Sequence, residues 1–404
     1  MHLPPSLRYR QFAVFWAGLM IAWIANQVLV WSIPWHIRSF TDYPLALGVI
    51  GLIRLIPTIF ASLFAGVIAD KFNRRKVLFT TQSIMGLVAF ALAILTINEQ
   101  IKLWVVYALL SIQATAYVFD LPARYSITPN IVPGKVLPNA LSVEFIAIQI
   151  GGLLGPVLSG TLMNRFGQAA AYLAAAVLFA GMLIALILMG PVSQEKLQRN
   201  TSGTDWAAIK EGISFTFRHP LIMPSMLLDF LATLLTRADS LMPYFARDIL
   251  GLNAAQYGWL SAASAMGAST AALTLTQVRQ IKRQGPLLLG SVVLIGAAAV
   301  VFGASRIFIL SMAALILAGA SDSVSSIIRS TIRQTNTPDA LRGRMTSVNQ
   351  IFFMGGPYLG DVKNGFLGSL IGVPLAVGLG GLICIASVGW IARQWPALRN
   401  YDGV

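Results

Sequence analysis

Apolar residues run through this sequence in long stretches, and short segments with charged residues, glycine or proline separate them. A helix needs about 20 mainly apolar residues to cross a bilayer, because the hydrocarbon core is about 30 Å thick. The pattern therefore predicts membrane-spanning helices. We expect twelve of them, at residues 12–36, 46–69, 77–97, 102–120, 138–163, 169–190, 220–244, 256–278, 286–304, 307–328, 346–368 and 372–392.

The longest polar segment, residues 191–219, lies between the sixth and seventh predicted spans. We expect an all-α membrane protein of two pseudo-symmetric six-helix bundles, residues 1–190 and 220–404, with 191–219 as a cytoplasmic linker. Part of this linker, Trp206 to Phe217, fits an amphipathic helix at the membrane surface or a plain solvated loop.

Composition and charge placement agree with this interpretation. Of 404 residues, 56% are hydrophobic and 11% charged, whereas a soluble domain carries about 25% charged residues. The net charge of +14 results from 29 Lys and Arg residues, of which 21 lie in segments on the side of the N-terminus. Five lie on the other side: Arg38, Lys102, Arg165, Arg247 and Arg306. By the positive-inside rule we expect both termini to be cytoplasmic. We expect the protein to lie in a bacterial inner membrane. We expect no nucleic-acid partner, because the basic residues follow the topology.

The segment after the second predicted span, residues 66–76, reads GVIADKFNRRK. It resembles the loop signature of the major facilitator superfamily, G-x-x-x-D-[RK]-x-G-R-[RK], with Asn73 in place of glycine. Asparagine tolerates positive φ, so we expect the turn to survive. The resemblance implies a conformational latch, and an ordinary positive-inside loop is the alternative. The residues assigned to the latch are Gly66, Asp70, Lys71, Arg74, Arg75, Arg124, Arg342 and Arg344, with Asp120 beside Arg124 as a further partner of the loop.

The fifth predicted span contains GGLLGPVLSG at residues 151–160. This run resembles the antiporter motif of the same superfamily, G-x-x-x-G-P-x-x-G-G. Small residues four apart let helices approach closely, and a proline bends the helix. We expect Gly151, Gly155, Pro156 and Gly160 to form a helix-packing motif, either with a bearing on the direction of transport or for packing alone.

Two more segments resemble one branch of the superfamily, the branch that includes the enterobactin exporter and related secretion and drug efflux transporters. One runs from Pro122 to Ala140 and joins the fourth and fifth spans; the other runs from Thr337 to Met345 and joins the tenth and eleventh. Their matching places support an internal duplication. The branch implies export of siderophores or drug-like molecules.

A charge near the bilayer centre costs about 2.5–3.5 kcal/mol on insertion scales, so each one suggests a function. Eight lie in predicted spans: Arg54, Glu144, Asp229, Arg237, Asp239, Asp322, Asp361 and Lys363. Residues two apart point in different directions on a regular helix. We therefore expect no direct pairing of Arg237 with Asp239 or of Asp361 with Lys363, and a partner for each on a neighbouring helix.

Glu144 and Asp229 are the candidates for the coupling proton, because a carboxylate inside a membrane can alternate between neutral and charged forms; a permanent pair with an arginine is the alternative. Arg54 fits the binding of an anionic substrate group or a structural ion pair. The other five intramembrane charges are assigned to the substrate path. So is an aromatic and amide face of the first span, which suits stacking on a flat substrate: Trp23, Asn26, Gln27 and Trp31.

The sequence has no G-x-x-x-x-G-K-[ST], H-E-x-x-H or G-x-S-x-G motif. We therefore expect no enzyme, cofactor or metal. The leading interpretation is a monomeric, proton-coupled exporter of a siderophore or related amphiphile, with protons, a small molecule and the lipid bilayer as partners. A multidrug efflux antiporter and, more distantly, a non-transporting receptor or scaffold are the alternatives.

Overall fold

The structure is a computed structural model that describes residues 4–192, 214–278 and 281–403, without some side chains of α2 and α13. Each of the twelve predicted spans has a helix at its place. The first six are α1 (Arg10–Phe40), α2 (Pro44–Lys71), α3 (Arg74–Ile97), α4 (Leu103–Ile131), α5 (Leu137–Phe166) and α6 (Gln168–Met189). The second six are α8 (Ile222–Thr236), α10 (Ala254–Thr276), α11 (Gln284–Ala304), α12 (Phe308–Thr335), α13 (Asp339–Ile371) and α14 (Val373–Gln394).

Short helices connect or end these elements. They are η1 (Pro5–Arg8), η2 (Gly134–Val136), η3 (Asp239–Leu241), α9 (Met242–Tyr244), the π-helix η4 (Phe245–Ile249) and α15 (Pro396–Arg399). Of the predicted linker, residues 193–213 lie outside the described residues, and 214–218 are helical.

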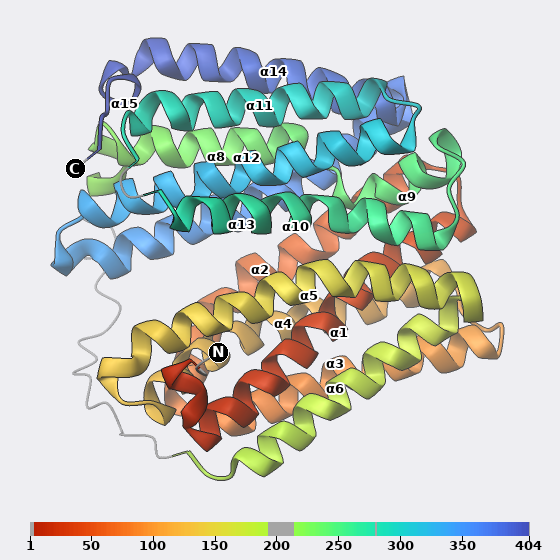
Figure 1. The fold of residues 1–404 in the computed structure, drawn as a ribbon. Coiled ribbons are helices and arrows are strands. Elements are labelled where there is room, and N and C mark those ends of the chain that lie inside the picture. Colours follow the sequence, from red (N-terminus) through yellow and green to blue (C-terminus); the bar gives the residue numbers. More distant parts are fainter. Residues whose placement is uncertain (1–3, 193–213, 279–280, 404) are drawn as a thin grey trace. The chain divides into compact units, whose positions relative to one another are not determined.

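The chain folds into two compact units (Figure 1). The first comprises Met1–Asp42, Ile53–Lys196 and Gly251–Ala262, and the second comprises Tyr43–Leu52, Leu197–Leu250 and Ala263–Val404. In the first unit α1 packs on α5 and α6, and α3 packs on α4 and α6. In the second unit α11 packs on α12 and α14, and α8 packs on α13. Each unit thus has its own helical core.

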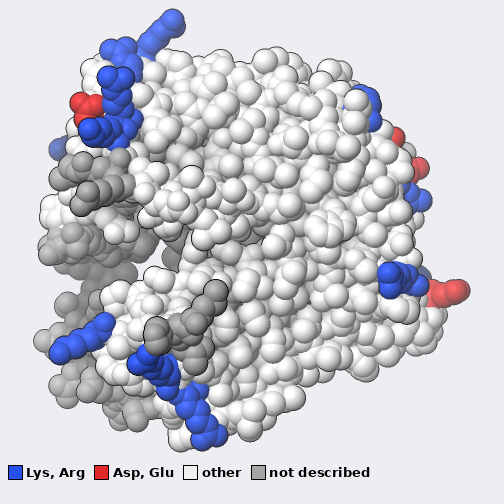
Figure 2. All heavy atoms as spheres, in the orientation of Figure 1, with Lys and Arg blue, Asp and Glu red and all other residues white. Residues whose placement is uncertain are grey.

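The outer surfaces of the helices are apolar. Large hydrophobic side chains are exposed along α6 and α14, among them Ile184, Leu188, Leu375 and Ile383. Figure 2 shows the described charged side chains near the helix ends and a broad uncharged surface between them. Nine helices in the described part of the chain are long and apolar enough to cross a membrane. Together with the twelve helices, this confirms the predicted all-α membrane fold.

Two helices are longer than predicted. α4 continues to Ile131 although the sequence predicted a loop from about residue 121, and α12 continues to Thr335 rather than 328. Pro122 and Pro129 lie inside α4, where the side chains of Ser126 and Asn130 donate to backbone carbonyls four residues before them. Polar segments that were assigned to loops are therefore helical.

The predicted span 220–244 is interrupted. α8 ends at Thr236, and Arg237 is extended with φ −69° and ψ 131° before the chain turns helical again at Asp239. In a membrane, backbone groups freed by such a break need partners from the protein. Three side chains of α13 supply them: Lys363 Nζ donates to Leu235 O over 2.8 Å, Asn364 Nδ2 donates to Arg237 O over 2.6 Å, and Asp361 Oδ1 accepts from Ser240 N over 3.2 Å.

The other end of α8 is also fixed. His219 Nδ1 accepts hydrogen bonds from the backbone N–H groups of Leu221 and Ile222, over 3.2 and 3.3 Å. Burial lowers the pKa of His219, which agrees with a neutral imidazole that accepts rather than donates at Nδ1. Both ends of this short helix are therefore held by side chains.

Candidate functional site

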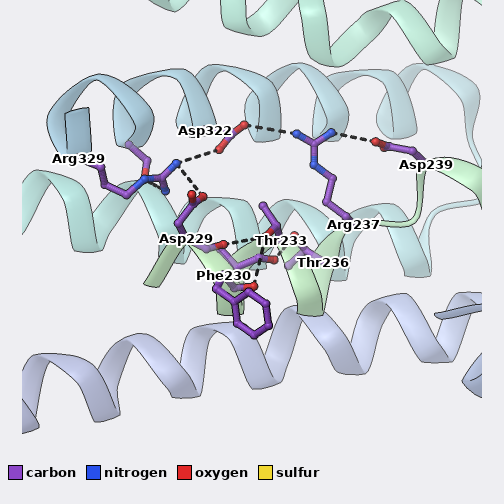
Figure 3. A network of polar contacts seen from close by, with 10 residues as sticks. Asp229, Phe230, Thr233, Thr236, Arg237, Asp239, Asp322 and Arg329 are labelled. Atoms are coloured by element: carbon purple, nitrogen blue, oxygen red, sulfur yellow. Dashed lines mark hydrogen bonds and ion pairs between the residues drawn. The ribbon is translucent and has the colours of Figure 1, made fainter. Parts of the chain in front are cut away.

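A chain of ion pairs links α8 and α12 in the second unit (Figure 3). Asp229 of α8 accepts from Arg329 of α12, with Oδ1 and Nη2 2.8 Å apart. Arg237, just after α8, pairs with Asp239 over 2.9 Å. Between these two pairs lies Asp322 of α12, 3.6 Å from Arg237 and 3.8 Å from Arg329. Three carboxylates and two guanidinium groups thus form one network.

Burial divides this network into two parts. The side chains of Asp229 and Arg329 are 5% and 2% exposed, whereas Arg237 and Asp322 are 38% exposed. The network borders a cavity of about 170 Å³ whose wall also includes Thr233, Ser326, Phe353, Met354, Pro357 and Tyr358. The cavity therefore combines charged groups with an aromatic and apolar wall, as a binding site for an amphiphile requires.

The pairing of Arg237 with Asp239 contradicts the sequence prediction. The prediction assumed a regular helix, on which residues two apart diverge. Because α8 ends at Thr236, the extended backbone at Arg237 lets both side chains reach one another. The break thus creates the accessible half of the network.

The other prediction from spacing is confirmed. Asp361 and Lys363 do not pair with each other, and both bind α8 or the segment after it. Their described partners are backbone groups, however. This places them at the helix break, as its supports. Neither lines the cavity beside Asp322, and their assignment to the substrate path stays a prediction.

Arg329 is the residue that sequence analysis missed. It was counted as a loop residue, because the tenth span was predicted to end at 328. The internal repeat contains a signal for it: Arg124 precedes Pro133 by nine residues, and Arg329 precedes Pro338 by nine. Nine residues after each proline comes Ser-Val, at 142 and 347. Arg329 is therefore the counterpart of Arg124.

Arg124 lies in a different environment in the first unit. Its Nε and Nη2 atoms both donate hydrogen bonds to Asp120 Oδ2 of the same helix, over 2.9 and 2.5 Å. The other oxygen of Asp120 accepts from Thr81 and Gln82 of α3 over 2.9 and 2.7 Å. The guanidinium also lies over the ring of Trp23, 5.1 Å from its centroid. Asp120 and Arg124, expected to be partners of the loop at Asp70, thus bind each other.

Glu144 and Arg54 also lie in the first unit. Glu144 of α5 is 6% exposed and accepts a hydrogen bond from Thr128, and Arg124 interacts with it electrostatically. Arg54 of α2 is half-buried and makes no ion pair with the described residues.

The latch is described only in part. The side chains of Asp70, Lys71, Arg342 and Arg344, and the surroundings of Gly66, lie outside the described residues. Arg74 Nη1 donates to Ser126 O and Arg75 Nε to Leu186 O, each over 2.8 Å. Asn73 has φ −62° and its side chain accepts from Lys76 N, so it caps α3 without a positive φ.

The small residues of α5 serve close packing on α1. A Cβ on Gly151 would lie 2.7 Å from Trp23 Cβ, and one on Gly155 would collide with Gln27 Cβ. Gly160 similarly leaves no room for a Cβ, against Gly258 of α10. Pro156 is buried beside them.

Consequently, the predicted aromatic and amide face of α1 is largely covered. Trp31 and Asn26 are 9% exposed, and Asn26 accepts from Gln113 over 2.9 Å. The ring of Trp31 packs edge-on against Tyr257. Trp23 and Gln27 are half-buried.

Comparisons with known proteins agree with this fold. The chain is 28% identical over 360 residues to the enterobactin exporter EntS of Citrobacter koseri. This alignment covers 89% of this chain and 85% of the exporter. A bacterial homologue of the human lysosomal transporter Spinster shares the fold with a TM-score of 0.73 at 14% identity, over 98% of this chain and 99% of that one. The nucleoside transporter NupG does so with a TM-score of 0.71 at 15% identity, over 97% and 99%.

The family model of the transmembrane secretion effectors matches residues 3–402, which is nearly the whole chain. This match confirms the resemblance to the major facilitator superfamily on which the sequence analysis relied, and it agrees with a transporter rather than an enzyme. The chain belongs to the transmembrane secretion effector family, a family of membrane transporters of the major facilitator type.

Proposed function

We propose that this transporter is a proton-coupled exporter of an amphiphilic small molecule, with Asp229 as the first candidate for the proton carrier and Glu144 as the second. The observation that carries the proposal is the network around Asp229. A buried carboxylate that shares one arginine with a second, accessible carboxylate can lose its charge without leaving that arginine unpaired. Proton binding at Asp229 is thereby linked to the cavity.

A siderophore is the first candidate for the substrate, because the similar protein of Citrobacter koseri is named an enterobactin exporter. Arg54 supports an anionic substrate group, since it is half-buried without an ion pair to the described residues. A multidrug substrate range is the second candidate. It is favoured by the mixed charged and apolar wall of the cavity at Asp322.

The direct test is transport by the purified protein in proteoliposomes with an imposed pH gradient. Asp229→Asn and Glu144→Gln mimic the protonated form of each carboxylate. If Asp229 or Glu144 carries the proton, the amide variant of that residue should lose uphill export. The same variant should still exchange substrate down its concentration gradient. Asp42→Asn, an exposed acid of the first unit, is the matched control and should export normally. Uphill export by both amide variants with an unchanged pH dependence would exclude both carriers.

We further propose that both termini are cytoplasmic and that residues 1–190 and 220–404 are the two transporting halves. The 21 basic residues on one side support this orientation. Reporter fusions at Asn200 should be cytoplasmic, and fusions near Arg165 periplasmic. The reverse pattern would contradict the orientation. Asp70→Asn should slow transport without reducing membrane insertion if the loop is a latch, whereas unchanged flux would leave it only a topogenic signal.

A further inference from the structure

The ion-pair network of the second unit has three carboxylates for two guanidinium groups. Asp229 forms a close pair with Arg329, and Asp239 forms a close pair with Arg237. Asp322 is the fifth member, and its distances of 3.6 and 3.8 Å to the two guanidinium groups exceed hydrogen-bond length. Its carboxylate is therefore accessible and has no hydrogen-bonded partner in the network.

The accessible part of the network carries a net negative charge, and of its members Asp322 and Arg237 line the cavity whereas Asp239 does not. Asp322 and Asp239 are 38% and 41% exposed, and Arg237 is the accessible cation between them. Asp229 and Arg329 are buried and neutralise each other. The wall of the same cavity also contains Phe353, Met354 and Tyr358. A carboxylate beside aromatic and thioether groups favours an ammonium group attached to an apolar body.

Arg329 lies between the carboxylates of Asp322 and Asp229 and can bind either one. Its Nη2 atom is 2.8 Å from Asp229 and 3.8 Å from Asp322, so a small movement exchanges one partner for the other. Nη1 is bound to Ser325 of the same helix over 2.7 Å, which keeps the guanidinium between the two carboxylates. Neutralising Asp229 would leave Asp322 as the only charged carboxylate near Arg329 in the described network.

We propose that Asp322 binds a protonated amine of the substrate, and that Arg329 changes partner from Asp229 to Asp322 when Asp229 takes up a proton. The proton binds to the Asp229 carboxylate, and the freed guanidinium then neutralises Asp322. The ammonium group loses its partner and leaves. Substrate binding in turn occupies Asp322 and keeps Arg329 on Asp229, because coupling between two sites is reciprocal. This inference rests on the proposed proton coupling at Asp229 and adds the chemical class of the ligand.

Other groups face Asp229 and Asp322 as well. Arg333 of α12 and Arg237 interact electrostatically with Asp229. Tyr358 of α13 borders the same cavity. Neither arginine can replace Arg329 as the direct link between the two carboxylates. Within the described residues Arg237 lies 3.6 Å from Asp322 but forms no ion pair with Asp229, and Arg333 forms no ion pair with either carboxylate.

Binding of dansylcadaverine to the purified chain in nanodiscs tests this proposal without any gradient. This probe joins an aromatic group to a primary amine, which stays protonated below about pH 9 because an alkylamine has a pKa near that of lysine. The matched probes are N-butyl dansylamide, which lacks the amine, and dansylglycine, which carries a carboxylate. Asp42→Asn is the control variant.

The wild type should bind the amine more tightly than both matched probes, and acidification should weaken that binding. Asp322→Asn should weaken it by about tenfold or more, since close charge pairs contribute at least this much. Asp229→Asn should weaken it similarly although Asp322 is intact, because Arg329 then stays on Asp322. Adding Arg329→Gln to Asp229→Asn should restore binding. The double variant removes one charge of each sign, and size-exclusion chromatography checks its folding.

Wild-type affinity in Asp322→Asn, or a preference for dansylglycine, would overturn the amine site. Normal amine binding by Asp229→Asn, or none by the folded double variant, would overturn the change of partner. These binding results can be told apart from a failure of the proposed proton-coupled export, which only the transport assay measures. If the probe behaves as expected but no uphill transport occurs in proteoliposomes, the proposed proton coupling is wrong and the ligand site remains.

Discussion

Arg124 and Arg329 occupy the same place in the two halves of the sequence, yet they have different partners. Arg124 binds Asp120 on its own helix, and Thr81 and Gln82 of α3 complete the bonds of that carboxylate. Arg329 has Ser325 at the corresponding position, four residues before it, and its acidic partner is Asp229 on another helix. A second carboxylate, Asp322, lies within reach.

The difference separates a structural pair from an exchangeable one. Every charge-bearing oxygen of Asp120 is hydrogen-bonded, so its replacement would leave several buried groups unpaired. The arginine of the second unit can change partner at little cost, because a second carboxylate is already within 4 Å. The two arginines at corresponding places thus have different roles: Arg124 stabilises the fold, and Arg329, we propose, couples proton and substrate binding.

The largest effect is expected for Asp120→Ser, which gives α4 the residue that α12 has. Arg124 would then keep the electrostatic interaction with Glu144 of α5, but within the described residues it forms no close ion pair with that acid as Arg329 does with Asp229. An unpaired buried charge costs about 3–5 kcal/mol. Folded yield and thermal unfolding of the purified protein should both fall sharply. Asp322→Ser is the matched variant in the second unit and should unfold nearly as the wild type does; equal losses in both would contradict the comparison.

Ser325→Asp makes the reverse change and should abolish coupling while leaving the fold intact. The new carboxylate would bind Arg329 four residues away on the same helix, as Asp120 binds Arg124. Asp229 would lose its arginine and remain protonated, because an isolated buried carboxylate is strongly disfavoured in its charged form. Proteoliposome assays should show exchange without uphill export. Normal uphill export by this variant would show that Arg329 need not change partner.

A moderate effect is expected for Lys363→Met, which removes the donor to Leu235 O at the end of α8. An unsatisfied buried carbonyl costs about 1–3 kcal/mol, and Arg237 would also be less well placed. Thermal unfolding of the purified protein measures the loss. Lys102→Met at a helix start provides the control and should change the melting temperature little. If both variants melt alike, the break in α8 does not depend on α13.

The smallest effect is expected for Asn73→Ala in the first unit. It removes the cap of α3, with an expected loss of about 1 kcal/mol in the free energy of unfolding. Asn73→Gly should cost only a few tenths of a kcal/mol. Chemical denaturation of the purified protein can resolve this order. A larger loss for the glycine variant would mean that the side chain matters for more than the cap.

The sequence predicted the helices of this fold well, because long apolar runs leave few alternatives in a membrane. It failed where polar residues continue a helix. Arg124 and Arg329 were placed at or beyond helix ends, since hydropathy falls there although α4 and α12 continue. The break at Arg237 was also missed, because the bonds that stabilise it come from Asn364 and Lys363, more than 120 residues away.

The candidate site was predicted residue by residue but not as a network. Asp229, Arg237, Asp239 and Asp322 were recognised because charges are rare inside spans. Their shared partner Arg329 was found only in the structure, although the spacing to Pro338 was a usable signal. Spacing along one helix cannot reveal contacts between helices, and for that reason the bonds of Asp361 and Lys363 to the break after α8 were not predicted.

The central claim is that the cluster in the second unit, unlike that in the first, exchanges a proton for the substrate. The most direct measurement is the change of luminal pH that substrate causes in proteoliposomes, recorded for the wild type and Asp229→Asn at equal protein content. We predict a pH change that requires substrate in the wild type and none in Asp229→Asn, which still exchanges substrate at concentrations that saturate its weakened site. An equal substrate-dependent pH change in both proteins would contradict the account.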